Sequence, residues 1–181
     1  QLAYHLEHAT TPATYESCST SAFRHGRTET VRPATMATKR CVEALGAGTS
    51  PQRARPLLEE CSRVHSKLTK EAAMGQGFDR HLFALRLLAE ERGGPMPRLF
   101  RDPCFVKANH FCLSTSTLHG TAFSGGGFAP VVPDGYGLGY GMVDGCFGVL
   151  TSSYAPHRDA SRFASALTEA LNRICAAMAA R

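Results

Sequence analysis

The sequence predicts an α/β fold in which helices flank a mixed sheet. Three observations support this prediction. A segment near the start alternates its side chains with the period of a strand, and longer segments repeat apolar residues every three or four positions, as amphipathic helices do. A glycine-rich stretch without Lys or Arg then contains several short apolar runs of strand length. With 181 residues, 43% of them hydrophobic, the chain has enough apolar material for one core.

The N-terminal half is expected to hold one strand and three helices. Alternation over residues 13–20 places Tyr15 and Ser17 on the same face of a strand, and a turn follows at Gly26. Ser50 and Pro51 suit the N-cap and the first position of a helix. The helices are expected over residues 33–45, 51–72 and 78–89, each ending shortly before glycine.

The C-terminal half is expected to supply most of the sheet. No Lys or Arg occurs between Lys107 and Arg158, so we expect this segment to be largely buried. The strand over 13–20 is expected to pair with chain outside this sequence. Apolar runs predict further strands over residues 110–118, 128–132, 137–143 and 147–154, and a final helix over 159–178.

Charge and cysteine content exclude several classes of protein. The net charge of +5 comes from interleaved charges, so we expect solvated helix faces and no nucleic-acid partner. No run of about 18 apolar residues is present to span a bilayer. The seven cysteines are scattered and lack CxxC spacing, so we expect reduced, mostly buried thiols and neither a disulfide framework nor a zinc site. Because the sequence starts without Met or a signal peptide, we expect a fragment of a longer protein.

Clustered hydroxyl groups are the first candidates for chemistry. On a strand, Ser114 and Ser116 point to the same face, where their O–H groups can donate to an anion or a developing oxyanion. The same pattern also fits an ordinary polar strand. The turn after residues 13–20 can bring Thr28 beside Tyr15 and Ser17, either to surround a small anion or to make structural hydrogen bonds.

Other candidates carry charge or glycine. Arg80 lies in the first turn of an expected helix, where it is either exposed or delivered into a pocket to bind a carboxylate. The eight histidines show no metal-ligand spacing on one helix, and no GxSxG nucleophile motif occurs. Alternate glycines over residues 135–141 precede no helix, so they indicate close packing in a strand pair and not a dinucleotide-binding loop.

Five segments, taken together, resemble the motifs of the choline/carnitine O-acyltransferase family in that family's order and approximate spacing. They are ATYESCST at 13–20, HGRTET at 25–30, GFDRHL at 77–82, STS at 114–116 and PVVPDGYG at 130–137. Residues 26–33 and 70–86 are most similar to the long-chain enzymes of the mitochondrial inner membrane. The resemblance implies that residues 1–181 form the C-terminal part of a two-domain carnitine acyltransferase fold.

The resemblance also implies roles for the candidate residues. Choline acetyltransferases carry an apolar residue in place of Thr28 and a neutral one in place of Arg80, so both residues favour carnitine over choline. Short-chain members place a bulky Met near Gly126, so a glycine there implies an acyl tunnel open to long chains. Carnitine binding is implied for Tyr15, Ser17, Thr28, Arg80 and Ser114, and support of the tetrahedral oxyanion for Ser116.

The implied activity is long-chain acyl transfer between coenzyme A and the carnitine hydroxyl, which serves β-oxidation. The implied partners are carnitine and long-chain acyl-coenzyme A, with no cofactor, metal or nucleic acid. The parent protein would lie peripherally on the matrix side of the mitochondrial inner membrane. The family's base is the His of a His-x-x-x-Asp motif, which this sequence lacks, so we expect the chain alone to be inactive. A non-catalytic carnitine- or acyl-binding module and an outer-membrane or peroxisomal carnitine acyltransferase remain alternatives.

Overall fold

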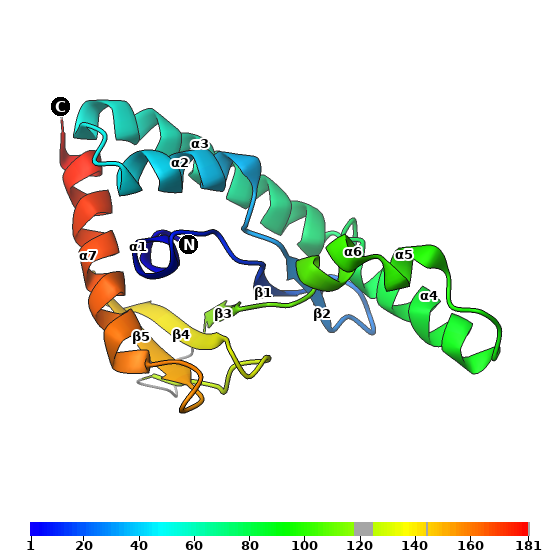
Figure 1. The fold of residues 1–181 in the computed structure, drawn as a ribbon. Helices are drawn as coiled ribbons and strands as arrows, with labels where there is room; N and C mark the ends of the chain where they lie inside the picture. The colour runs from blue at the N-terminus through cyan, green and yellow to red at the C-terminus, as the bar shows by residue number, and fades with distance from the viewer. Residues whose placement is uncertain (118–124, 144, 181) are drawn as a thin grey trace.

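The computed structural model describes residues 1–117, 125–143 and 145–180, which contain a five-stranded sheet and flanking helices (Figure 1). The strands are β1 (Thr14–Ser19), β2 (Thr28–Val31), β3 (Leu113–Thr117), β4 (Tyr136–Val143) and β5 (Cys146–Ser153). Their order is β2-β1-β3-β4-β5. The central strands β1, β3 and β4 run parallel, and β2 and β5 are antiparallel to their neighbours. The predicted mixed α/β fold is therefore confirmed.

The helices lie mainly on one side of the sheet. They are α1 (Leu2–His8), α2 (Met36–Gly46), α3 (Pro51–Ala73), α4 (Asp79–Glu91), α5 (Arg98–Arg101), α6 (Pro103–Ala108) and α7 (Ala160–Ala179). Helices α1, α2, α3 and α7 contribute to the core on that side of the sheet, whereas α4 extends away from it (Figure 1). No helix in the described ranges is both long and apolar enough to cross a membrane.

Side-chain caps explain where two of the helices begin. The Oγ1 of Thr35 accepts a hydrogen bond from the backbone N–H of Thr38, so α2 starts three residues later than the sequence predicts. At α7, Oδ1 of Asp159 accepts from the backbone N–H groups of Ser161 and Arg162. The expected helices over 51–72 and 159–178 are confirmed as α3 and α7 within one or two residues.

The core lies between α7, α1 and one face of the sheet. Leu113 of β3, Tyr136 of β4 and Phe163 of α7 are fully buried, and the rings of Tyr136 and Phe163 stack with centroids 4.1 Å apart. Burying side chains of this size stabilises the fold by about 1.5–3 kcal/mol each. Since side chains alternate along a strand, the residues next to Leu113 and Tyr136 in sequence face the other way. The opposite face of these strands therefore carries side chains with hydroxyl groups, such as Ser114, and glycines, such as Gly137.

The strand expected over residues 128–132 is wrong. This segment has no strand structure, because Pro130 and Pro133 cannot donate to a ladder. It crosses the sheet instead, with the carbonyl oxygen of Phe128 accepting from Oγ of Ser152 at 2.5 Å. A Cβ at Gly137 would lie 2.4 Å from that carbonyl oxygen. The alternate glycines of β4 thus permit close packing, as expected. They pack against the segment at 126–129, which crosses the sheet, as well as against the neighbouring strands.

Three other expectations fail. The stretch between Lys107 and Arg158 is not largely buried, because Met142 and Leu150 are 66% and 50% exposed. Strand β1 is paired on both edges, by β2 and β3, and needs no outside chain as a neighbour. The thiols are free but not mostly buried, since Cys104, Cys146 and Cys175 are exposed. The expected strand over 110–118 begins only at Leu113, and its last residue lies outside the described residues.

Candidate functional site

The register of the parallel strands gathers hydroxyl groups on the face of the sheet away from the core. Tyr15 pairs with Ser114, so Tyr15, Ser17, Ser114 and Ser116 all point to this face. The Oγ atoms of Ser17 and Ser116 lie 3.1 Å apart and form a hydrogen bond in which either can donate. We call this surface, defined by these four residues and by Thr28 and Thr30 of β2, the hydroxyl face.

Strand β2 brings Arg80 to the hydroxyl face. The antiparallel register pairs Ser19 with Thr28, which places Thr28 on the same face as Ser17. Arg80, in the first turn of α4, donates from Nε to the carbonyl oxygen of Thr28 at 2.8 Å and from Nη2 to its Oγ1 at 3.1 Å. Gly77 permits this approach of α4, because a Cβ there would lie 2.3 Å from Cγ of Glu29. Arg80 and Thr28, both predicted from the sequence as candidate site residues, are therefore in direct contact.

Arg32 holds the start of α4 in place, and sequence reasoning missed it. Its Nε donates to Oδ2 of Asp79 at 2.9 Å, and its Nη2 forms an ion pair with Oδ1 of the same carboxylate. Nη1 donates to the carbonyl oxygen of Ala108 at 2.6 Å, and the guanidinium lies 4.9 Å from the ring centroid of Phe111. Because Asp79 precedes Arg80, this clamp fixes the direction from which Arg80 approaches Thr28.

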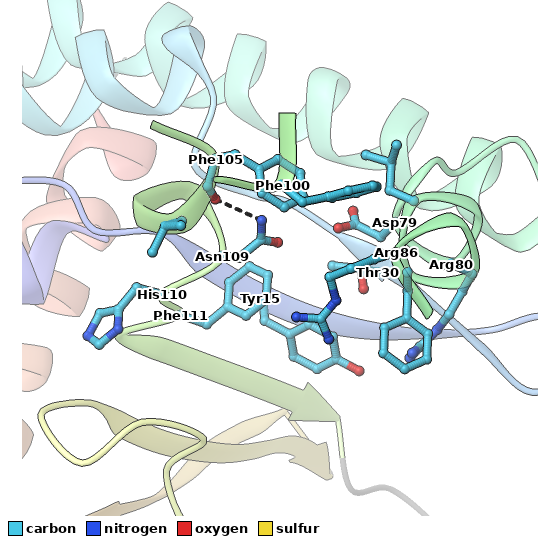
Figure 2. A pocket seen from close by; sticks show the side chains of 13 residues that line it. Tyr15, Thr30, Asp79, Arg80, Arg86, Phe100, Phe105, Asn109, His110 and Phe111 are labelled. Carbon is cyan, nitrogen blue, oxygen red and sulfur yellow. Dashed lines mark hydrogen bonds between the residues drawn. The ribbon is translucent and has the colours of Figure 1, made fainter. Parts of the chain in front are cut away.

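A pocket of about 470 Å³ opens between β1, α4 and α6 (Figure 2). Tyr15, Arg80 and Arg86 lie on the same side of it, and Phe100 and Phe105 form the opposite wall (Figure 2). The pocket is also lined by Thr30, Asp79, Leu82, Phe83, Val106, Asn109, His110 and Phe111. Since Arg32 pairs with Asp79, the remaining charge at the pocket is positive. A pocket with two guanidinium groups and aromatic walls suits an organic anion.

The pocket and the serine pair are neighbouring parts of one surface. Tyr15 lines the pocket and Ser17 does not, but these two residues are consecutive on one face of β1, roughly 7 Å apart. Ser114 is buried beside Tyr15 in the adjacent strand. The structure thus brings together all five predicted carnitine-binding residues and Ser116 on three strands and one helix.

A second network on the core side of the sheet fixes the register of β1. The carboxylate of Glu16 accepts from the Tyr140 hydroxyl at 2.5 Å and from Oγ1 of Thr115 at 3.1 Å. Oγ1 of Thr115 also lies 3.1 Å from the carbonyl oxygen of Tyr15, a second acceptor. Burial and the hydrogen bond to Glu16 raise the pKa of Tyr140, so its phenol remains a donor. Three strands are tied together directly behind Ser17 and Ser116.

Gly126 lies against β4. A Cβ at Gly139 would be 2.3 Å from the carbonyl oxygen of Gly126, so the backbone there rests directly on the sheet beside Ser116, which pairs with Gly139. Residues 118–124, which precede this segment, lie outside the described residues. The expected acyl tunnel at Gly126 stays a prediction.

One group of side chains with metal-ligand chemistry lies at the edge of the pocket. His110, Cys112 and Asp134 each offer one ligand atom, and these atoms lie within 4.8 Å of one another. Sequence spacing alone could not find this group, because Asp134 is 24 residues from His110. Thr30, in contrast, could have been found, since it alternates with Thr28.

Comparisons with known proteins agree with this arrangement. A family model described as choline/carnitine O-acyltransferase matches residues 1–169. The chain is 52% identical to the mitochondrial carnitine O-palmitoyltransferase 2 of Xenopus tropicalis over 177 residues, which are 96% of this chain and 27% of the relative. The human protein of the same name is 53% identical over 174 residues, 94% of this chain and 26% of the relative. The peroxisomal carnitine O-octanoyltransferase of Bos taurus is 40% identical over 168 residues, 90% of this chain and 27% of the relative.

The chain thus spans about a quarter of the length of the curated relatives that it matches. The match nevertheless includes β1, β2, β3 and α4, the four elements that carry the hydroxyl face and Arg80. With a family model covering most of its residues and identities above 50% to two of these relatives, the chain belongs to the choline/carnitine O-acyltransferase family.

Proposed function

We propose that residues 1–181 are the carnitine-binding, C-terminal part of an acyltransferase domain. The protein that contains them transfers a long-chain acyl group between coenzyme A and the hydroxyl of carnitine. The observation that carries the proposal is the convergence of the Ser17–Ser116 pair and the Arg80–Thr28 contact on one sheet face beside an aromatic pocket. The names of the relatives, which specify carnitine and palmitoyl transfer, support the same reaction.

Arg80 supplies the positive charge for the carboxylate of carnitine. Its Nε and Nη2 donate to Thr28, which fixes the guanidinium. Nη1 has no hydrogen-bond partner within residues 1–117, 125–143 and 145–180, and can donate to the ligand. A charge-assisted hydrogen bond of this kind offsets the cost of taking a carboxylate out of water. Tyr15, Ser17 and Ser114 add neutral O–H groups, so a ligand without a carboxylate gains little here.

Ser116 stabilises the oxyanion of the tetrahedral intermediate. When the carnitine hydroxyl attacks the thioester carbonyl, negative charge develops on the carbonyl oxygen, and a positioned O–H donor lowers the energy of that state. In the chain without substrate, Ser17 and Ser116 satisfy each other at 3.1 Å. Substrate binding separates their tasks: Ser17 donates to the carboxylate, and Ser116 donates to the oxyanion. The general base comes from outside this chain, which has no His-x-x-x-Asp motif.

The acyl group passes Gly126, where the missing side chain leaves room for a long hydrocarbon chain. The higher identity to palmitoyltransferases than to the octanoyltransferase favours this specificity. The word mitochondrial in the names of the first relatives supports a location in that organelle. We place the protein peripherally on the matrix side of the inner membrane, with coenzyme A and carnitine as substrates and no cofactor.

The test is an assay of the full-length protein with palmitoyl-coenzyme A and either carnitine or choline as acceptor. We expect palmitoylcarnitine to form and choline to be acylated at least roughly 10-fold less efficiently, because a charge-assisted hydrogen bond to the carboxylate contributes about 1.5–3 kcal/mol. Binding of carnitine without any transfer would instead indicate a non-catalytic binding module. Equal use of choline would overturn the assignment of Arg80.

A further inference from the structure

We propose that His110, Cys112 and Asp134 form a binding site for a zinc ion at the edge of the pocket. One ligand atom from each of these residues lies within 4.8 Å of the other two, and Nε2 of His110 is 2.7 Å from Oδ1 of Asp134. An imidazole nitrogen, a thiolate sulfur and a carboxylate oxygen are the three kinds of ligand that zinc takes in proteins. The inference rests on these residues alone and does not depend on the proposed acyl transfer.

The three ligands are held at the same end of two neighbouring parallel strands. His110 and Cys112 flank Phe111 just before β3, and Asp134 lies in the turn before β4. The backbone N–H of Tyr136 donates to the carbonyl oxygen of Cys112 at 2.8 Å, which joins the two segments. Gly135 allows this close approach, because a Cβ there would lie 3.0 Å from the same carbonyl oxygen. The site is therefore built on the sheet and not on free loops.

Small side-chain rotations would complete the geometry. Ligand atoms of a tetrahedral zinc ion lie roughly 3.4–3.6 Å apart, given its usual bond lengths. The present separations of 2.7 Å to at most 4.8 Å bracket this value. A zinc ion would take the place of the hydrogen bond between His110 and Asp134. The side chains of both residues are 45% exposed, which leaves a fourth position for water and a path for the ion.

Charge balance also fits a divalent cation. A zinc ion bound here would displace the proton of the Cys112 thiol to solvent. The thiolate and the Asp134 carboxylate would then neutralise the charge of the ion, with His110 as a neutral ligand. Arg158 is a cation in contact with this group: its Nε donates to the carbonyl oxygen of Asp134 at 2.7 Å, and its Nη2 donates to the Tyr4 hydroxyl. These hydrogen bonds direct the guanidinium to neutral oxygens, and they hold the backbone of Asp134 in place.

The site adjoins the pocket without using its arginines. His110 lines the pocket, but its ring lies at the margin, away from Arg80 and Arg86 (Figure 2). A metal bound here would fix the imidazole and alter one end of the pocket wall. Reversible binding of zinc would therefore change the wall of the pocket at His110 and leave the residues of the hydroxyl face unchanged.

The experiment is a titration of the full-length, chelator-treated protein with Co²⁺, followed through the thiolate-to-cobalt charge-transfer absorption. We expect one equivalent to bind with this absorption and Zn²⁺ to displace it. Cys112→Ser should abolish the charge-transfer absorption, and His110→Gln should weaken binding at least roughly 10-fold. Cys175→Ser, which removes an exposed thiol on α7, is the matched control and should change nothing.

Two results would overturn the zinc site. One is wild-type protein that shows no charge-transfer absorption with Co²⁺. The other is an absorption that survives Cys112→Ser, since it would come from other thiols. If Cys112→Ser fails to fold, His110→Gln decides the matter alone, because the His110 side chain is half-exposed and not part of the core. A rise in the unfolding temperature of the wild type with Zn²⁺, absent in His110→Gln, is the second readout.

Discussion

Each hydroxyl group of the hydroxyl face has one proton to donate, and this limits what Ser17 and Ser116 can do together. In the structure they hydrogen-bond to each other at 3.1 Å, so one donor is already in use. A carboxylate and an oxyanion both need donors, and binding of both reactants must therefore break this pair. In the proposed reaction, the two serines form a preformed pair whose O–H groups turn from each other to the substrates.

The first prediction concerns Ser116. Ser116→Ala removes a donor that is needed only when the oxyanion develops, so we expect kcat of the full-length protein to fall by roughly 10²–10³ while KM for carnitine changes little. Steady-state kinetics at saturating palmitoyl-coenzyme A measure both constants. Ser165→Ala, on the exposed side of α7, is the control. A rise in KM without loss of kcat would place Ser116 in substrate binding instead.

Tyr136 gives a prediction about pH. Burial, and then the nearby Glu7, raise its pKa to about 12 from the ordinary 10.0. A raised pKa means that the stability from this phenol is complete below pH 10 and is lost as pH rises towards 12. The free energy of unfolding should therefore fall between pH 10 and 12. In Tyr136→Phe its slope against pH should be shallower, by the equivalent of up to one bound proton. Denaturant titrations from pH 9 to 12 measure this slope. Tyr154→Phe, which changes an exposed tyrosine, is the control. A slope in Tyr136→Phe identical to that of the wild type would contradict the account.

At the scale of elements, β1 depends on Glu16 for its alignment with β3 and β4. Its carboxylate accepts from Thr115 on the adjacent strand β3 and from Tyr140 on β4, the next strand in the sheet. The alignment of β1 with β3 sets the 3.1 Å contact on the other face of the sheet. Glu16, on the face of the sheet opposite to the serine pair, therefore helps to position Ser17 and Ser116 without contacting the substrate.

The corresponding prediction is that Glu16→Ala destabilises the fold by about 1–3 kcal/mol, because it leaves the partly buried Tyr140 hydroxyl without its acceptor, whereas Thr115 keeps the carbonyl oxygen of Tyr15. Equilibrium unfolding in urea measures the change. Glu16→Gln keeps an acceptor for Tyr140 and should lose less than half as much. If Glu16→Ala and Glu16→Gln lose the same amount, charge and not hydrogen bonding explains the effect.

Long periodic segments could be predicted from the sequence, and short ones could not. The apolar stripes of α3 and α7 and the alternation in β1 define those elements without help from the rest of the fold. Helix α1 has seven residues and β2 has four, too few for a period to show. The run at 128–132 is apolar like a strand, but Pro130 within it and Pro133 directly after it prevent pairing.

At the scale of the whole molecule, one sheet separates a core face from a chemical face. The residues that meet on the hydroxyl face are far apart in sequence: 99 residues separate Ser17 from Ser116, and 52 separate Thr28 from Arg80. Periodicity predicts which face of its own strand a residue occupies, but not which strand lies beside it. The resemblance to a family predicted the set, and the register β1–β3 gives the physical reason for it.

Supporting residues could not be predicted, because their roles exist only in three dimensions. Arg32 joins β2 to α4 and to the end of α6, and Glu16 joins three strands. Nothing in the local pattern distinguishes either residue from an exposed charge. The apolar stripe of α4 shows that periodicity predicts a helix and not its burial: the expected helix over 78–89 is present as α4, yet Leu85 and Leu88 are more than 40% exposed.

The central claim, that Arg80 holds the carboxylate of carnitine, is tested most directly by the kinetics of Arg80→Gln in the full-length protein, with exposed Arg92→Gln as control. We predict that KM for carnitine rises roughly 10- to 100-fold, as expected for loss of a charge-assisted hydrogen bond, while kcat changes little. An unchanged KM for carnitine, or an equal rise in Arg92→Gln, would contradict the account.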